Sequence, residues 1–235
     1  MDIRAVIRDL EEIAPPECAD EMDAGRIGLI IEGRPEIGRV MCALDATPAV
    51  VSEAVRSGAD MLIVHHTPIW SPVTSVSRPL GSLLKQVLDA DLNIYVMHTN
   101  FDHAKGGIND ALADLLGLTS VAGMTLGVCG DCSLDIAGFV SRLGSPLRTW
   151  GVVELPCRIG VAGGSGFDLE CIREAASLGA KAYLSAELKH SVARISPLPL
   201  IESTHYALEA PGMRRLAERM GWRFIDDPPV MATWR

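Results

Sequence analysis

The feature that most constrains the fold of this chain is an alternation of short apolar runs with stretches of helical spacing. The apolar runs predict strands, and the amphipathic stretches between them predict helices. The first half has predicted strands at 28–31, 38–44, 60–64 and 93–97, and predicted helices within 1–24 and at 48–57, 80–90 and 107–116. Strands interleaved with helices are typical of a mostly parallel sheet covered by helices. We therefore predict an α/β fold.

A second α/β set begins near residue 157 with the same alternation. Its predicted elements are strands at 158–162, 181–185 and 198–202, and helices at 167–178 and 207–220. We expect two similar α/β lobes, residues 1–120 and 157–235, joined by an irregular or strand-rich connecting segment at 121–156. Open α/β sheets bind ligands beyond the carboxyl ends of their strands, so we expect a site in a central cleft between the lobes.

Short matches between the two sets favour an internal duplication. Glu53-Ala54 followed by Gly58-Ala59 matches Glu174-Ala175 followed by Gly179-Ala180 at a constant offset of 121, which also places His66 on Glu187. Farther along, His98-x3-Asp102 matches His205-x3-Glu209. Each half therefore carries a histidine with an acidic residue four positions later.

The composition is that of an ordinary soluble domain, with 48% hydrophobic and 22% charged residues. The net charge of −9 argues against a dedicated nucleic-acid-binding surface. The first residues, Met1-Asp2-Ile3-Arg4, carry charges where a signal peptide needs an apolar run, and no stretch is apolar enough to span a membrane. We expect a cytoplasmic protein without a membrane partner.

The six cysteines show no disulfide framework, and a cytoplasmic protein keeps them reduced. Cys129-Gly130-Asp131-Cys132 is a single CxxC without a second one. We favour two small residues on a turn after a strand over a redox pair or a metal site.

Five of the six histidines fall in three short segments that also carry acids or follow a predicted strand. These segments are His65-His66-Thr67-Pro68, His98-Thr99-Asn100-Phe101-Asp102-His103 and His205-Tyr206-Ala207-Leu208-Glu209. Histidine and carboxylate are the natural ligands of Zn, Mn and Fe(II). The alternatives are ordinary ones: a histidine pair that ends a strand, an exposed His103, and a surface pair His205–Glu209 in a first helical turn.

His65 and His66 are adjacent, so on a regular strand they point to opposite faces and would serve two ions rather than chelate one. His98 can act as a ligand, as a group that holds a ligand, or as a proton shuttle.

The segment Gly163-Gly164-Ser165-Gly166 lies between a predicted strand and a predicted helix, where a backbone can approach a phosphate. It fits neither the P-loop nor the dinucleotide-binding fingerprint, and a tight structural turn is an equally good interpretation.

The chain resembles the Nif-three-like family, whose members often carry the name GTP cyclohydrolase I type 2 homologue. The resemblance spans nearly the whole chain and rests on an ordered set of motifs. These are Gly58-Ala59-Asp60 leading to His65-His66-Thr67-Pro68, His98-Thr99-Asn100-Phe101-Asp102 with Gly107-x-Asn109-Asp110-x-Leu112, the glycine turn 163–166, Glu187-x2-His190, and His205-x3-Glu209.

This resemblance implies two divalent metal ions per chain, of unknown identity among Zn, Mn and Fe(II). The implied ligands are His65, His66, Asp102, His205 and Glu209, with Glu209 as the bridging ligand. It also implies two similar α/β halves, often assembled into a homo-oligomeric, hexameric ring. Many members carry an inserted domain between the halves, and this chain looks like a short form without it.

We expect a metal-dependent hydrolase that acts on a small-molecule substrate, a nucleotide or another small phosphorylated or heterocyclic compound. His98 would pass protons and Glu187 would orient the nucleophile, so these two are the predicted catalytic residues. The competing interpretation is a non-catalytic metal-binding or regulatory scaffold that acts through protein partners.

Overall fold

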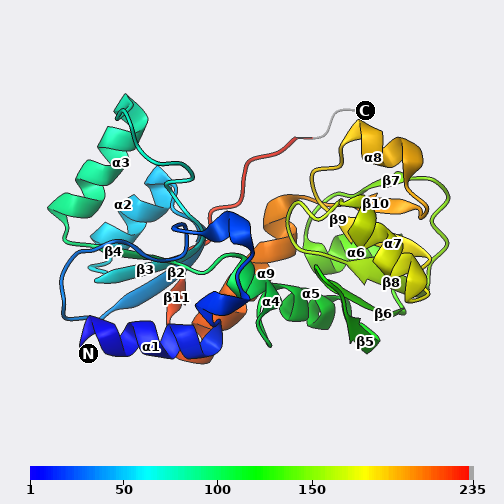
Figure 1. Cartoon of the computed structure of the whole chain (residues 1–235), viewed down its shortest axis with the longest axis horizontal. Helices are drawn as coiled ribbons and strands as arrows, with labels where there is room; N and C mark the ends of the chain where they lie inside the picture. The colour runs from blue at the N-terminus through cyan, green and yellow to red at the C-terminus, as the bar shows by residue number, and fades with distance from the viewer. Residues whose placement is uncertain (233–235) are drawn as a thin grey trace. The chain divides into compact units, whose positions relative to one another are not determined.

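A computed structural model describes residues 1–232, which form two compact units (Figure 1). The first unit contains Met1–Ala104 together with the described residues from Met213 onward, and the second contains Lys105–Gly212. Each unit is built on its own mixed β-sheet, with five strands in the first and six in the second. The predicted α/β fold is therefore confirmed. Within the described residues, no helix combines the length and apolarity needed to cross a membrane.

The sheet of the first unit has the order β1-β4-β3-β2-β11, and β1 is its antiparallel member. The strands are β1 (Gly28–Ile31), β2 (Val40–Asp45), β3 (Met61–His66), β4 (Asn93–Val96) and β11 (Arg223–Phe224). The helices and 3-10 turns are α1 (Ile3–Ile13), η1 (Pro16–Cys18), η2 (Glu21–Asp23), α2 (Pro48–Arg56), α3 (Arg78–Asp89) and α4 (Thr99–His103).

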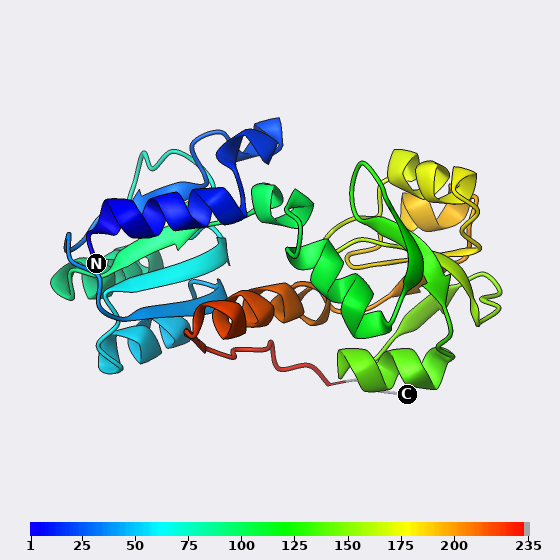
Figure 2. The same cartoon turned by 90° about the horizontal axis from the view of Figure 1, so that it is seen from below.

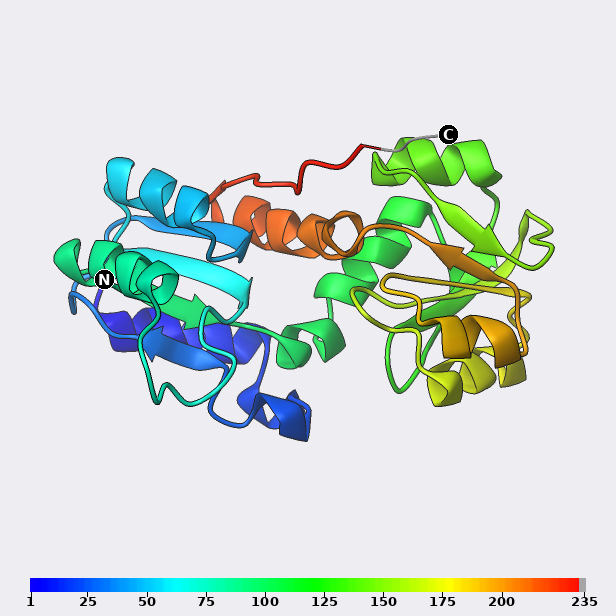
Figure 3. The ribbon, with the colours of Figure 1, turned by 90° about the horizontal axis from the view of Figure 1, so that it is seen from above.

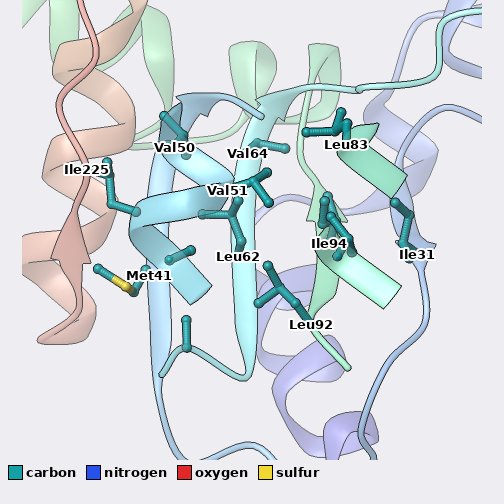
Figure 4. Packing of buried hydrophobic residues seen from close by; sticks show 14 of the residues in the cluster. Ile31, Met41, Val50, Val51, Leu62, Val64, Leu83, Leu92, Ile94 and Ile225 are labelled. Carbon is teal, nitrogen blue, oxygen red and sulfur yellow. The ribbon is translucent and has the colours of Figure 1, made fainter. Parts of the chain in front are cut away.

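Helices cover both faces of this sheet. Figure 4 shows one face, where Val51 of α2 and Leu83 of α3 pack with Leu62 of β3 and Ile94 of β4. Figures 2 and 3 show α1 on the opposite face. Successive strand residues point to opposite faces, which is why β2 and β3 are buried along nearly their whole length.

The sheet of the second unit has the order β5-β6-β8-β9-β10-β7. Its strands are β5 (Thr119–Gly123), β6 (Val128–Cys132), β7 (Arg148–Trp150), β8 (Cys157–Val161), β9 (Ala182–Ser185) and β10 (Leu200–Glu202). Its helices are α5 (Ile108–Leu116), α6 (Ile136–Leu143), α7 (Leu169–Ser177) and α8 (His190–Ile195). Helix α9 (His205–Met220) begins in this unit and ends in the first.

This sheet also has a core on each face. Leu112 of α5 and Phe139 of α6 pack on one side of the sheet. Ile172 of α7 and Val192 of α8 pack on the other side. The views in Figures 2 and 3 agree, with α5 and α6 on one face and α7 and α8 on the opposite face.

The two sheets share part of their topology. In the first, parallel strands β2, β3 and β4 lie side by side and antiparallel β1 borders β4. In the second, parallel strands β8, β9 and β10 lie side by side and antiparallel β7 borders β10. Thus each unit contains four strands with the same order and directions.

The boundaries of the units differ from those of the expected lobes. We expected 121–156 to connect two lobes, but β5, β6 and β7 from that region belong to the second sheet. Residues 105–120, expected in the first lobe, lie in the second unit, and β11 returns to pair with β2. Hydrophobic pattern identifies a strand but does not name its partner, because pairing forms between segments far apart in the chain.

The predicted strands and helices are all present, with ends shifted by a few residues apart from the first helix, which ends at Ile13. The elements α4, β5, β6, α6, β7, α8 and β11 were not predicted individually, although a strand-rich segment was one of the two expectations for residues 121–156. β5 is largely exposed, so it lacks the apolar alternation that marks a half-buried strand. The CxxC was placed wrongly on a turn, since Cys129 and Cys132 both lie within β6.

Gly160 of β8 occupies a position with no room for a side chain. A Cβ added there would lie 2.7 Å from the Cβ of Ala175 and 2.7 Å from Cδ2 of Tyr183. We expect Gly160→Ala to lower the free energy of unfolding by about 1–3 kcal/mol, because overpacking a buried site forces its neighbours to move. Urea unfolding measures this change.

Gly123→Ala is the matched control, since Gly123 lies in β5 of the same sheet and a Cβ there meets nothing within 4 Å. Its effect should stay within about 0.5 kcal/mol, as is usual for an unconstrained surface site. Equal losses in the two variants would contradict the packing of β8 against α7.

Candidate metal centre

Three histidines of the first unit gather where two parallel strands end. His65 and His66 close β3, and His98 follows β4, its neighbour in the sheet. The ring centroids of His65 and His66 lie 4.9 Å apart, as do those of His65 and His98. One potential ligand atom from each of the three rings lies within 4.8 Å of the others. The three side chains can therefore hold a metal ion.

Each of these rings is held through Nδ1 by an oxygen acceptor. Nδ1 of His65 lies 2.7 Å from the carbonyl oxygen of Met97, and Nδ1 of His66 lies 2.7 Å from Oδ1 of Asp45. Nδ1 of His98 lies 2.8 Å from Oδ1 of Asp23. A carbonyl or carboxylate can only accept, so each Nδ1 carries the proton and donates it. This tautomer presents the lone pair on Nε2, as metal-binding histidines do.

Asp102 adds a carboxylate to this group. It lies on α4, four residues after His98, and its Oδ1 is 3.5 Å from Nε2 of His65. The neighbouring His103 is exposed, as expected, and its Nε2 lies 3.2 Å from Oδ1 of Asp20. Of the two histidines of this segment, only His98 lies with His65 and His66 in the described structure.

Asp23 is the buried acid behind His98. Burial alone would raise the pKa of its carboxyl, but hydrogen bonds from His98 and Thr99 outweigh it and lower that pKa from 3.8 to about 2. Oδ2 of Asp23 accepts from the hydroxyl of Thr99 at 2.5 Å and from its backbone N–H at 3.0 Å. The carboxylate therefore stays ionised and anchors both residues.

Since the folded-state pKa of Asp23 lies below its unfolded value, its ionised form stabilises the fold above about pH 4, and this contribution is lost as the pH falls toward about 2. We expect Asp23→Asn to lower the free energy of unfolding at pH 7 by about 1–3 kcal/mol, because the new amide faces the Thr99 donors. The difference from the unchanged protein should shrink across that acid window. Urea unfolding at several pH values measures it.

Asp20→Asn is the control, because Asp20 is an exposed acid that contacts His103. An exposed pair contributes only about 0–1 kcal/mol. A constant difference between Asp23→Asn and the unchanged protein from pH 7 to pH 2 would contradict the role given to Asp23.

The second unit carries another histidine and acid pair. Nε2 of His205 lies 2.8 Å from Oε2 of Glu209, one turn later on α9. The Thr204 hydroxyl accepts from the N–H of Ala207, so Thr204 caps the start of the helix. Nδ1 of His205 lies 2.7 Å from Oε1 of Glu187, which repeats the arrangement of the other rings. Glu187 thus contacts a predicted ligand.

The glycine turn packs against Glu209. A Cβ on Gly164 would lie 2.0 Å from Oε1 of Glu209 and 3.1 Å from Nε2 of His205. The hydroxyl of Ser185 accepts from the N–H of Gly166 and donates to the carbonyl of Gly164. The N–H of Gly163 donates to the side chain of Asn109. These contacts favour the structural interpretation of the turn over a phosphate loop.

An exposed tryptophan borders the histidines of the first unit. The Trp70 ring lies edge-on to His98 at a centroid distance of 5.2 Å, and 42% of the residue is exposed. Nε of Arg26 donates to the carbonyl of Trp70 at 2.7 Å, and the guanidinium lies 5.9 Å from the indole centroid. Arg26 therefore holds an aromatic side chain beside the imidazoles.

The structure places the predicted residues in two sets, one per unit. His65, His66, His98 and Asp102 belong to the first, and Glu187, His205 and Glu209 belong to the second. The sequence did not predict Asp23 and Asp45, the acids that accept from Nδ1 of His98 and His66. Asp45 ends β2 directly beside His66 of β3, so the parallel register offered a signal. Asp23 lies in η2, far from any motif, and offered none.

The donor set fits a divalent transition metal. It consists of imidazole nitrogens and carboxylate oxygens, which suit Zn, Mn and Fe(II) alike. The cysteines lie elsewhere: Cys129 and Cys132, for example, are buried in the cores of the second sheet. The rings are also already oriented by their Nδ1 partners, as expected for metal ligands.

Known proteins are similar to this one over nearly the whole chain. The family model described as Duf34/NIF3 (NGG1p interacting factor 3) matches residues 1–229. A Streptomyces coelicolor protein named GTP cyclohydrolase 1 type 2 homolog is 32% identical over 254 residues, covering 92% of this chain and 87% of the relative. A protein of the same name from Halalkalibacterium halodurans is 37% identical over 120 residues, covering 50% of this chain and only 32% of the relative.

The fold has solved counterparts as well. The structure of reduced HcgD from Methanocaldococcus jannaschii is similar with a TM-score of 0.82 and 26% sequence identity. The match covers 95% of this chain and 96% of that one. The similarity therefore extends over both units.

Proposed function

The chain belongs to the DUF34/NIF3 family, and on that premise we propose that it binds two divalent metal ions. The proposed ligands are His65, His66, Asp102, His205 and Glu209. The proposal covers Zn, Mn and Fe(II), since all three accept imidazole and carboxylate ligands. We expect about two ions per chain by elemental analysis, as the family resemblance implies.

One observation carries this proposal: each ring that is a proposed ligand is fixed through Nδ1 by an acceptor. Met97 holds His65, Asp45 holds His66 and Glu187 holds His205, all at 2.7 Å. Such partners orient the ring, fix the tautomer and raise the basicity of Nε2. A surface histidine without such a role does not require an oxygen acceptor at Nδ1.

We further propose that the protein is a metal-dependent hydrolase. When bound, the ions would supply a Lewis acid and bring a water molecule near ionisation at neutral pH. His98 would accept or deliver a proton through Nε2, because Asp23 holds its Nδ1. Glu187 acts through His205 in this proposal, so it is a positioning residue rather than one that touches the substrate.

The proposed substrate is a nucleotide or another small phosphorylated or heterocyclic compound. Two observations support this class. Relatives carry the name GTP cyclohydrolase 1 type 2 homolog. Trp70 also exposes an indole beside His98, and a planar heterocycle can stack on such a surface.

The test is a screen of nucleotides and phosphoesters on metal-reconstituted protein, with His98→Ala alongside. We expect turnover of at least one compound, and a loss of about 100-fold or more in His98→Ala, as is usual for a general acid or base. His103→Ala, which removes the exposed neighbouring histidine, should keep its activity.

Metal content distinguishes the outcomes of that screen. Loss of activity with the ions retained supports proton transfer by His98, whereas loss of an ion makes His98 a ligand. No turnover on any compound, together with specific binding of a protein partner, would favour the metal-binding scaffold.

The homo-oligomeric ring implied by the family stays a proposal, and a stable monomer of 25.2 kDa in light scattering would contradict it.

A further inference from the structure

The two cysteines of the CxxC cannot form a pair with each other. They are three residues apart on β6, and an odd spacing on a strand places side chains on opposite faces of the sheet. Cys129 accordingly packs with Cys171 and Tyr183 under α7. Cys132 packs with Phe139 on the other face.

Cys132 instead has a direct partner across the sheet. β6 and β8 are antiparallel, and their register places Cys132 opposite Cys157. Directly opposed residues share a face, and both cysteines contact the same core cluster. The Cα atoms of opposed antiparallel residues are about 4.5–5.5 Å apart. A disulfide needs about 4.4–6.8 Å, so this pair can be bridged without moving the strands.

We propose that Cys132 and Cys157 form a disulfide site, closed by thiol–disulfide exchange with a small-molecule disulfide such as glutathione disulfide. Cys157 is partly exposed whereas Cys132 is buried, so Cys157 reacts first. Its thiolate attacks one sulfur of the reagent, forms a mixed disulfide and releases one thiolate. The thiolate of Cys132 then attacks Sγ of Cys157 and releases the second. In total, two cysteine thiols are oxidised and one reagent disulfide is reduced to two thiols.

The bond would close a segment of the chain that the sheet also holds at β7, inside the segment. Residues 132–157 contain α6 and β7, and β7 forms an edge of the sheet against β10. There Nη2 of Arg148 in β7 lies 2.6 Å from Oε2 of Glu202 in β10. Joining the two ends of this segment restricts the unfolded chain, so the oxidised protein should be more stable than the reduced one.

Burial raises the pKa of both Cys132 and Cys157. Since the thiolate is the reacting form, exchange should be slow near neutral pH and should accelerate as the pH rises.

The experiment uses the full chain with Cys18→Ser, which removes the exposed cysteine. After incubation with glutathione disulfide at mildly alkaline pH, we expect two of the five remaining thiols to resist alkylation, with a loss of two hydrogen masses. Peptide mapping should join Cys132 to Cys157. The melting temperature should rise by about 5–10 °C and return on reduction, as a disulfide in a chain of this size predicts.

Variants separate this site from the alternatives. Cys132→Ser should stop at a stable glutathione adduct on Cys157, and Cys157→Ser should leave Cys132 unmodified. Cys129→Ser, the matched control from the same CxxC, should form the bond normally. Alanine variants and melting curves of the reduced proteins check that each variant folds. A bond between Cys129 and Cys132, no protection of any thiol, or protection that requires Cys129 would overturn the proposal.

Discussion

Replacing Glu209 with alanine is expected to remove metal from the protein. Glu209 is buried, and its Oε2 lies 2.8 Å from Nε2 of His205. Glu187 orients this same imidazole through its contact with Nδ1. The loss in affinity should exceed the roughly 10–100-fold caused by removing an outer partner of a ligand, because the ligand itself is lost. Elemental analysis after dialysis measures the number of ions retained per chain.

Two further variants make that result interpretable. Glu209→Gln keeps the volume of the side chain and removes its charge, so a metal loss in this variant reports ligation rather than packing. Glu218→Ala removes an exposed acid from the same helix and should leave the metal content unchanged. Full occupancy in both Glu209 variants would end the case for Glu209 as a ligand.

Gly164→Ala is expected to disrupt the site without removing any ligand. The added Cβ would lie 2.0 Å from Oε1 of Glu209, far inside contact distance, so the carboxylate or the turn must shift from its present position. The residue also has φ +60°, so a side chain adds a strain of about 1–2 kcal/mol. We expect both weaker metal binding and a lower free energy of unfolding, measured by metal titration and urea unfolding.

Gly144→Ala isolates the second of these effects. Gly144 has the same φ of +60°, but a Cβ there meets nothing within 4 Å. It should lose stability through backbone strain alone and keep its metal affinity. If the two alanine variants bind metal equally well, the turn does not support Glu209 in the way we describe.

The sequence alone was sufficient to predict strands β3 and β4 and helix α9 at the site, whereas α4, which carries Asp102, was not predicted. The apolar runs ending at Val64 and near Met97 led to β3 and β4, and each is followed by histidine. The helical spacing of His205 and Glu209 was also readable, since residues four apart share a helix face. Such features are local, so a pattern of residue types along the chain contains them.

The partners of those histidines were decided by tertiary structure. Asp23 reaches His98 from 75 positions earlier in the chain, and Glu187, just after β9, reaches His205 at the start of α9, 18 positions later. No local pattern reveals such pairs, because they depend on how the chain returns on itself. The same holds for the cysteines, where the spacing Cys129–Cys132 gave no sign of a partner for Cys132 and the register of β6 with β8 opposes Cys132 to Cys157.

Unit boundaries show the same division between local and long-range information. Residue types and their spacing were enough to predict the α/β class, the order of the main elements and the side chains that can bind metal. They did not show that β5, β6 and β7 join the second sheet, that β11 returns to β2, or which oxygen acceptor holds each imidazole. The physical reason is that propensity and periodicity act over a few residues, whereas strand pairing and side-chain hydrogen bonds join segments far apart in the chain.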